Sequence, residues 1–253
     1  METNDYYDNQ GILSILKSKL KEGGLGFMLS EIFEYIADLF IMNFLFLKPK
    51  RSFLYRGQQL DYFYHKYNKT WKNERSIEVP IALCEIEKHK GERILEVGNV
   101  LRHYVKVKYD VLDKYEEEEG LIRDDIVDFI PANKYDFIIS ISTIEHVGID
   151  DKPANLSKAI IALQKMQGML KDGGKMFVSF PIGYNSALSD LSLMFSLNKL
   201  NKKIIYFKKT DASKNIWEEA KYSSVKDVPY SQPVKGVAFL EIAKEDSWHI
   251  ILR

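Results

Sequence analysis

A nearly continuous apolar run, YDFIISI from Tyr135 to Ile141, constrains the fold of this chain more than any other feature. A strand with one solvated face alternates apolar and polar residues, whereas a strand covered on both faces reads as an unbroken apolar run. On both sides of this run, short apolar segments alternate with amphipathic ones. That alternation predicts an α/β fold, in which a mostly parallel sheet carries helices on both faces.

The alternating pattern begins near residue 76 and continues to the end of the chain. The expected strands are 93–97, 105–112, 121–126, 135–141, 175–180, 204–209, 216–220 and 237–243. The expected helices are 76–90, 155–170 and 186–200, with Pro80 in the first turn of the first one. The closing run of strands predicts an antiparallel edge. We therefore divide the chain into an N-terminal extension over 1–75 and an α/β domain over 76–253.

The extension contains one segment of the length of a membrane span, Leu29 to Leu47. It carries three carboxylates, and Asp38 lies near its middle. A carboxylate at the centre of a span costs about 3 kcal/mol on insertion scales, so we expect a helix that does not cross a bilayer. Two interpretations stay open. The helix packs on the main domain or on a second copy of the chain, or it lies in a membrane surface beside the basic residues at 48–51.

An aromatic and polar stretch, Phe53 to Arg75, follows this segment and shows no clean period of 2 or 3.6 residues. Aromatic rings with polar tips suit a binding surface, because they offer both contact area and hydrogen bonds. A cap that only covers the core is the alternative interpretation.

Composition excludes several classes of protein. Lysine plus arginine and aspartate plus glutamate each total 36, so the formal net charge is zero and a nucleic-acid partner is not expected. Cys84 is the only cysteine, which rules out an internal disulfide and suits a cytoplasmic protein. We predict no metal site: the run Glu116 to Glu119 reads as a solvated turn. His65, His103 and His146 with Asp150 remain an alternative cation site.

Acidic and polar residues follow the predicted strands, at the edge where an open parallel sheet binds its ligands. These residues are Glu96, Gly98 and Asn99 after the first strand, Asp113 after the second, Asp124 and Asp125 after the third, and Ser142, Glu145 and His146 after the fourth. Carboxylates accept hydrogen bonds from ribose hydroxyls and from an exocyclic amine, so the pattern favours a nucleoside. The chain has no GxxxxGK[ST] motif, which excludes a P-loop nucleotidase.

The order RILEVG, an acid 17 positions after Glu96, YDFIISISTIEHVG and LKDGGKMFVSFPIG resembles the class I S-adenosylmethionine-dependent methyltransferases. The resemblance covers roughly residues 76–253. It implies a Rossmann-like, seven-stranded, mostly parallel sheet with an antiparallel last strand. The wider string YFYHKYNKTWKNERSIEVP also resembles an uncharacterised subgroup of methyltransferases often encoded with genes for cell-surface glycans.

The resemblance also implies residue roles. Cofactor contacts are expected from Glu96 and Gly98 at the methionine part, Asp113 at the ribose, Asp125 and Ile126 at the adenine, and Ser142 where the fourth strand opens onto the cofactor. Glu145 and His146 match the EH pair beside the transferred methyl group, and we expect His146 to act as a base.

The first motif departs from the E-x-G-x-G-x-G pattern of the family, since only Gly98 is present. The connection from Val97 to the next strand is also too short for a usual crossover helix. Asn99 is expected to adopt a positive φ in a tight turn, and Arg75 is a candidate for binding the methionine carboxylate.

Three functions follow from these observations. The first is an S-adenosylmethionine-dependent methyltransferase acting on a small molecule, by O-methylation of a sugar or a related hydroxyl. The second is a non-catalytic module that uses the fold for protein or membrane assembly. The third is a nucleotide-sugar dehydrogenase or epimerase, against which the absence of GxGxxG counts.

Overall fold

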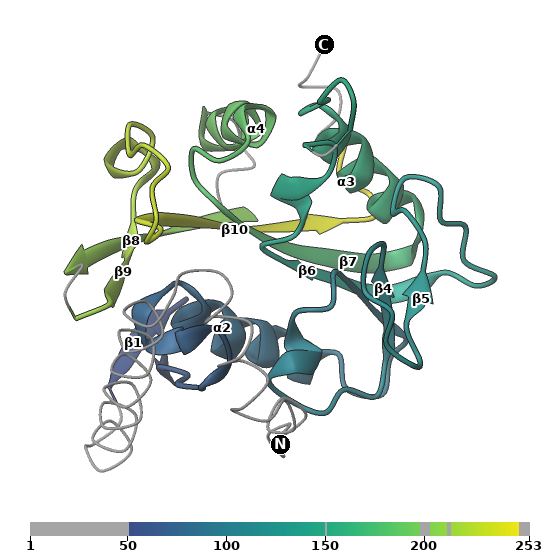
Figure 1. Cartoon of the computed structure of the whole chain (residues 1–253), viewed down its shortest axis with the longest axis horizontal. Helices are drawn as coiled ribbons and strands as arrows, with labels where there is room; N and C mark the ends of the chain where they lie inside the picture. The colour runs from purple at the N-terminus through teal and green to yellow at the C-terminus, as the bar shows by residue number, and fades with distance from the viewer. Residues whose placement is uncertain (1–50, 150, 198–202, 212–213, 248–253) are drawn as a thin grey trace, which may run out of the picture.

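The computed structural model describes residues 51–149, 151–197, 203–211 and 214–247. Within them an eight-stranded sheet has the order β5-β4-β3-β6-β7-β10-β8-β9, and a separate hairpin has the order β1-β2 (Figure 1). The predicted segment Leu29 to Leu47, like Asp150, lies outside the described residues. Within the described ranges, no helix has both the length and the apolar character needed to cross a membrane.

The strands and helices have the following bounds. The strands are β1 Ser52–Tyr55, β2 Gln58–Asp61, β3 Ile94–Val97, β4 Asp110–Asp113, β5 Ile122–Arg123, β6 Tyr135–Ile141, β7 Leu170–Pro181, β8 Ile204–Asp211, β9 Ile216–Ala220 and β10 Gly236–Ala243. The α-helices are α2 Arg75–Lys88, α3 Lys158–Gly168 and α4 Ser186–Leu197. The described ranges also contain four 3-10 turns: η2 Tyr67–Lys72, η3 Leu101–His103, η4 Ile144–His146 and η6 Tyr222–Ser224.

Strand directions confirm the predicted mostly parallel sheet with an antiparallel last strand. Strands β5, β4, β3, β6 and β7, in this order, pair parallel with one another. The last strand, β10, pairs antiparallel with both β7 and β8. It therefore lies inside the sheet, and β9 forms the edge next to β8. The structure describes eight strands in this sheet where the resemblance implied seven, because β9 adds an outer strand.

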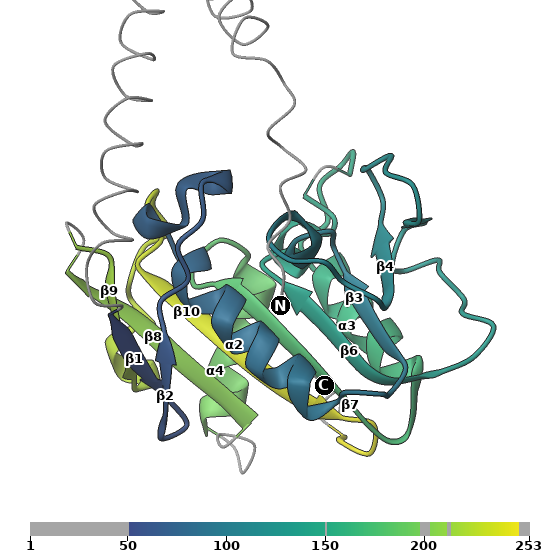
Figure 2. The ribbon, with the colours of Figure 1, turned by 90° about the horizontal axis from the view of Figure 1, so that it is seen from below.

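Two layers of helix cover the sheet. Figures 1 and 2 show α2 crossing one face, with α3 and α4 on the other. Strand β6 contributes Phe137, Ile139 and Ile141 to the core under α2, and Ile138 to the core under α3 and α4. Both faces of β6 are thus buried, which explains why its sequence is apolar almost throughout.

The aromatic stretch is more regular than its sequence indicated, since it begins with the β1–β2 hairpin. Arg56 and Gly57 form its two-residue loop with φ values of 50° and 77°, as a type I′ turn requires. Pro80 lies in the second turn of α2, not in the first as predicted. Proline has no N–H to donate to the carbonyl of Ser76, and that carbonyl accepts the N–H of Phe63 at 2.9 Å instead. The proline therefore helps to fasten this stretch to α2.

The connection between β3 and β4 contains no α-helix, as its length predicted. Its only helical turn is η3, and the predicted strand 105–112 is reduced to the four residues of β4. Because β3, β4, β5 and β6 run parallel, their carboxyl ends lie at the same edge of the sheet. Within the described residues, no α-helix directly follows β3 at this edge.

Candidate functional site

A cavity of about 340 Å³ lies at the carboxyl ends of β3, β4, β5 and β6. Its volume falls within the range of about 300–1,000 Å³ typical of small-molecule sites. The cavity is also at the point where strand order reverses, because β3 pairs with β4 on one side and with β6 on the other. Its walls are Val97, Gly98, Leu112, Asp113, Lys114, Tyr115, Asp124, Asp125, Ile126, Ser142, Thr143, His146, Val147, Gly148 and Lys158.

Gly98 is the first residue of the turn after β3 and lines the cavity. Its φ is +88°, and a Cβ added there would lie 2.1 Å from Thr143 Oγ1, so no other residue fits without displacing the β6 loop. The positive φ predicted for Asn99 is at Gly98 instead. Behind the turn, the buried carboxylate of Glu96 accepts the N–H groups of Val100 and Leu101 at 3.0 and 2.7 Å. Burial raises the pKa of Glu96 to about 7, against the lowering effect of these bonds.

Asp113 ends β4 and faces the cavity while bracing the loops around it. Its Oδ1 accepts the N–H groups of Tyr115 and Glu116 at 2.8 and 2.9 Å. Its Oδ2 accepts the N–H of Asn99 at 3.1 Å. A carboxylate has about four acceptor positions, so one of them on Oδ2 stays available to a ligand hydroxyl.

Asp125 lies between two lysines at the far end of the cavity. Its Oδ2 is 3.0 Å from Lys114 Nζ and 3.1 Å from Lys158 Nζ. Burial alone would raise the pKa of Asp125, but the hydrogen bonds from Lys114, the Val127 N–H and Lys158 outweigh it and lower the pKa. Beside it the buried side chain of Ile126 supplies an apolar wall.

Ser142 connects the cavity to a buried polar network under α2. Its Oγ donates to Glu78 Oε1 at 2.6 Å, and Ser179 Oγ donates to the same oxygen at 2.7 Å. Arg75 donates to the other oxygen of Glu78. Burial by itself would lower the pKa of Arg75, but the neighbouring groups Glu78 and Glu74 raise it by more. The net pKa is above the ordinary value, so the guanidinium is charged. Arg75 is therefore engaged by Glu78, and it does not line the cavity.

Glu145 and His146 occupy η4 with opposite exposure. Glu145 is 2% exposed, and its Oε2 has no hydrogen-bond partner. Burial raises the pKa of Glu145 to about 8, so it is mostly protonated at neutral pH. The His146 side chain is 56% exposed, and its Nε2 lies 3.8 Å from Glu145 Oε1. Its Nδ1 lies 3.0 Å from the hydroxyl of Tyr184.

The structure thus brings six of the predicted site residues to the cavity wall: Gly98, Asp113, Asp125, Ile126, Ser142 and His146. The other four predicted residues do not line the cavity: Glu96, Asn99, Arg75 and Glu145. Glu96 and Asn99 bond the loops of the cavity wall, and Arg75 pairs with the buried Glu78. The sequence places Lys114 and Thr143 after predicted strands but assigns no role to them, and it does not indicate Lys158 or Glu78. The first three adjoin predicted residues in sequence or in space. The pair of Glu78 with Arg75 has the i,i+3 spacing of a helix, but its bonds from Ser142 and Ser179 join residues that are far apart in the chain.

One family model matches residues 103–207, and its description is "Caenorhabditis protein of unknown function, DUF268". Comparison with curated proteins finds no match.

Several solved structures are similar to this chain. The N-methyltransferase NodS from Bradyrhizobium japonicum is 12% identical over 67% of this chain and 96% of its own, with a TM-score of 0.39. An amino pentose methyltransferase from Micromonospora echinaspora is 12% identical over 46% and 56%, with a TM-score of 0.34. The sugar N-methyltransferase KedS8 from a Streptoalloteichus species is 12% identical over 54% and 60%, with a TM-score of 0.33. At these scores the similarity carries no functional argument of its own.

Proposed function

We propose that this chain is an S-adenosylmethionine-dependent methyltransferase that acts on a small molecule. The observation that carries the proposal is the cavity at the strand ends, with Gly98, Asp113 and Ile126 in its wall. A glycine that lets backbone approach a ligand, a carboxylate with an acceptor position left over and an apolar side chain are the surroundings that a nucleoside needs.

The residues present fit the adenosine part of the cofactor. Asp113 Oδ2 would accept a ribose hydroxyl, and Ile126 would contact one face of the adenine ring. Asp125 is held as an anion by Lys114 and Lys158, which leaves a carboxylate of fixed position to accept the exocyclic amine. Arg75 is paired with Glu78, so a carboxylate on the ligand must find other donors.

S-adenosylmethionine, when bound, supplies a methyl group on an activated sulfonium sulfur. The chain must then align the acceptor and remove its proton. We assign the removal of the acceptor's proton to His146. In the tautomer with hydrogen on Nδ1, that nitrogen donates to Tyr184 Oη, and the lone pair of Nε2 accepts the acceptor's proton. Glu145 is buried beside His146 and limits its rotation.

An acceptor hydroxyl on a sugar or a related small molecule suits the rings next to His146. Tyr184 lies 4.8 Å from the His146 ring and 4.7 Å from the Tyr230 ring, measured between centroids. Their faces and hydroxyls offer an apolar surface and hydrogen bonds together, which is the combination that sugars require.

Calorimetry with S-adenosylmethionine and S-adenosylhomocysteine tests the proposal. We expect binding in the micromolar range, weakened at least 10-fold by Asp113→Asn. Asp110→Asn is the matched control, because Asp110 begins the same strand at the opposite edge and pairs with Arg93. Absence of heat at millimolar ligand would contradict the proposal and favour the non-catalytic assembly module.

A further inference from the structure

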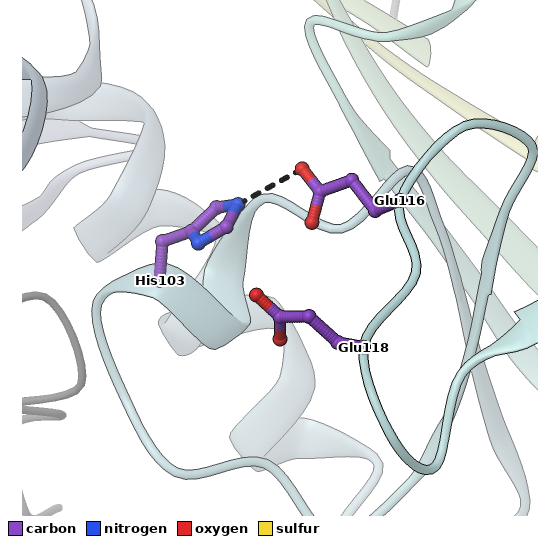
Figure 3. A group of neighbouring side chains, drawn as sticks. All are labelled: His103, Glu116 and Glu118. Carbon is purple, nitrogen blue, oxygen red and sulfur yellow. Dashed lines mark hydrogen bonds and ion pairs between the residues drawn. The ribbon is translucent and has the colours of Figure 1, made fainter.

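Three side chains that could hold a cation meet beside the cavity (Figure 3). His103 comes from η3, and Glu116 and Glu118 come from the loop that follows β4. His103 Nε2 lies 3.2 Å from Glu116 Oε1, and one ligand atom from each of the three residues lies within 4.8 Å of the others. His103 is only 6% exposed, so the imidazole is held in place.

The glutamate run is only in part the solvated turn that its sequence predicted. The side chains of Glu116 and Glu118 are 38% and 20% exposed and turn toward η3, whereas Glu117 is 73% exposed. The sequence-based alternative of His65, His103, His146 and Asp150 differs from this cluster. Among the described residues, the group of side chains that lies at metal-ligand spacing consists of His103, Glu116 and Glu118, and it includes neither His65 nor His146.

Asn99 supplies an independent indication of a ligand at this place. It is 3% exposed, and its Oδ1 is a buried acceptor with no hydrogen-bond partner. Its Nδ2 donates to Glu116 Oε2, so the amide group lies next to the cluster. Amide oxygen and nitrogen exchange places by a half-turn of the group. After that turn Oδ1 would face the cluster, where a bound cation would give this unpartnered acceptor a partner.

We propose that His103, Glu116, Glu118 and Asn99 bind a divalent transition-metal cation, with Mn²⁺ and Zn²⁺ as the best candidates. Imidazole is a preferred ligand of zinc and its neighbours, whereas carboxylate and carbonyl oxygens also suit manganese. A nitrogen ligand lies about 2.1 Å and an oxygen ligand up to about 2.2 Å from such an ion, so the two are at most about 4.3 Å apart. The cluster needs to contract by about 0.5 Å at its widest, which side-chain rotation supplies.

Local charge favours a cation. The loop places four consecutive carboxylates, Glu116 to Glu119, beside His103. The cations paired with the run are Arg102, whose Nε is 3.6 Å from Glu118 Oε2, and Arg123, which pairs with Glu117 at 2.8 Å. Arg102 also donates to the Glu119 carbonyl at 2.7 Å, so it can keep that bond while a metal takes the Glu118 carboxylate.

The ion would join two loops that frame the cavity. Asn99 and His103 belong to the connection after β3, and Glu116 and Glu118 to the loop after β4. This connection lacks a crossover helix. It is held against its neighbour by the backbone bond from Gly98 N–H to the Leu112 carbonyl and by bonds to side chains, such as Asn99 N–H to Asp113. A metal would add a strong bridge at the same place, independently of whether the cavity binds a nucleoside.

Calorimetric titration of the full chain with Mn²⁺ or Zn²⁺, in the absence of any nucleoside, tests the proposal. We expect one ion per chain and, at 100-fold excess over Kd, a rise in Tm of about 5–10 °C. Glu116→Gln should weaken binding at least 10-fold. Glu117→Gln is the matched control, since it removes the same charge from the same run but points away, and it should leave the affinity within 2-fold.

Asn99→Ala gives a second reading, because it removes a neutral ligand without changing the charge, and it should also weaken binding. Circular dichroism melts of the metal-free variants verify that each one folds. No binding at millimolar metal would overturn the proposal. Equal losses in Glu116→Gln and Glu117→Gln would overturn it as well, since they would mean diffuse attraction to a negative loop. A failure of nucleoside binding leaves both of these readouts unaffected.

Discussion

The backbone of Gly98 lies directly against the side chain of Thr143, at the point where strand order in the sheet reverses. A Cβ on Gly98 would sit 2.1 Å from Thr143 Oγ1 and 2.6 Å from Cγ2. The two residues follow adjacent parallel strands, β3 and β6, and both line the cavity. Their contact explains why a single glycine is present here even though the other glycines of the expected motif are absent.

Gly98→Ala is expected to lower the free energy of unfolding by about 3 kcal/mol or more, because the methyl group overlaps Thr143 and the φ of +88° disfavours an L-residue. Chemical denaturation measures the change. Gly168→Ala is the control, since Gly168 ends α3 with nothing within 4 Å of an added Cβ, and it should change stability by less than about 1 kcal/mol. A Gly98→Ala protein as stable as the parent would show that the β6 loop yields easily.

Glu78→Gln is expected to destabilise the fold by about 3–5 kcal/mol, because it leaves the Arg75 guanidinium buried without its partner carboxylate. Denaturant unfolding of Glu87→Gln provides the comparison. Glu87 lies on the same helix, but its side chain is 71% exposed, so its loss should cost at most about 0.5 kcal/mol. The double variant Arg75→Gln/Glu78→Gln should recover part of the loss, and equal instability of single and double variants would argue against an electrostatic cause.

Glu145 should make the protein less stable as pH rises. Burial raises its folded-state pKa to about 8 from an ordinary value of 4.5, so the folded state retains a proton that the unfolded chain releases. This contribution is fully present below pH 4.5 and is lost as pH rises through about 8. Glu145→Gln, which stays neutral, should gain up to about 4 kcal/mol over the parent between pH 5 and pH 8. Unfolding curves at several pH values measure the gain, and parallel pH profiles would refute the assignment.

His146→Ala is expected to reduce kcat by about 100-fold while leaving the affinity for S-adenosylhomocysteine within 2-fold, since a general base acts on the acceptor and not on the nucleoside. Tyr184→Phe should have a smaller effect on kcat, about 10-fold, because it removes the partner of Nδ1 and not the base itself.

His89→Gln is the control for this pair. His89 stacks on Phe137 and pairs with Glu92 at the end of α2, far from η4 in sequence and outside the cavity wall. Single-turnover kinetics with an acceptor identified by product mass would measure all three variants. An unchanged kcat in His146→Ala removes His146 from the role of base.

Much of the architecture could be predicted from the chain. The apolar run at 135–141 is β6, and Asp113 and Asp125 lie at the cavity because parallel strands place their carboxyl ends on one edge. Element ends were less predictable. The segment 105–112 contains enough apolar residues for a long strand, but only its last three residues, 110–112, pair with β3, and residues 106–109 are irregular chain.

The sequence by itself determined the kind of elements, their order and the edge of the sheet at which acidic side chains gather. Hydrophobic periodicity is a local property, and strands that alternate with helices imply a parallel sheet. Only the tertiary structure decided which of those side chains face a ligand. Glu78 accepts the hydroxyl of Ser142 from 64 positions away, Glu145 is buried and protonated, and Asn99 meets Glu116 from 17 positions away. Pairing and burial depend on residues that are distant in the chain, and the charge of a carboxylate depends on both.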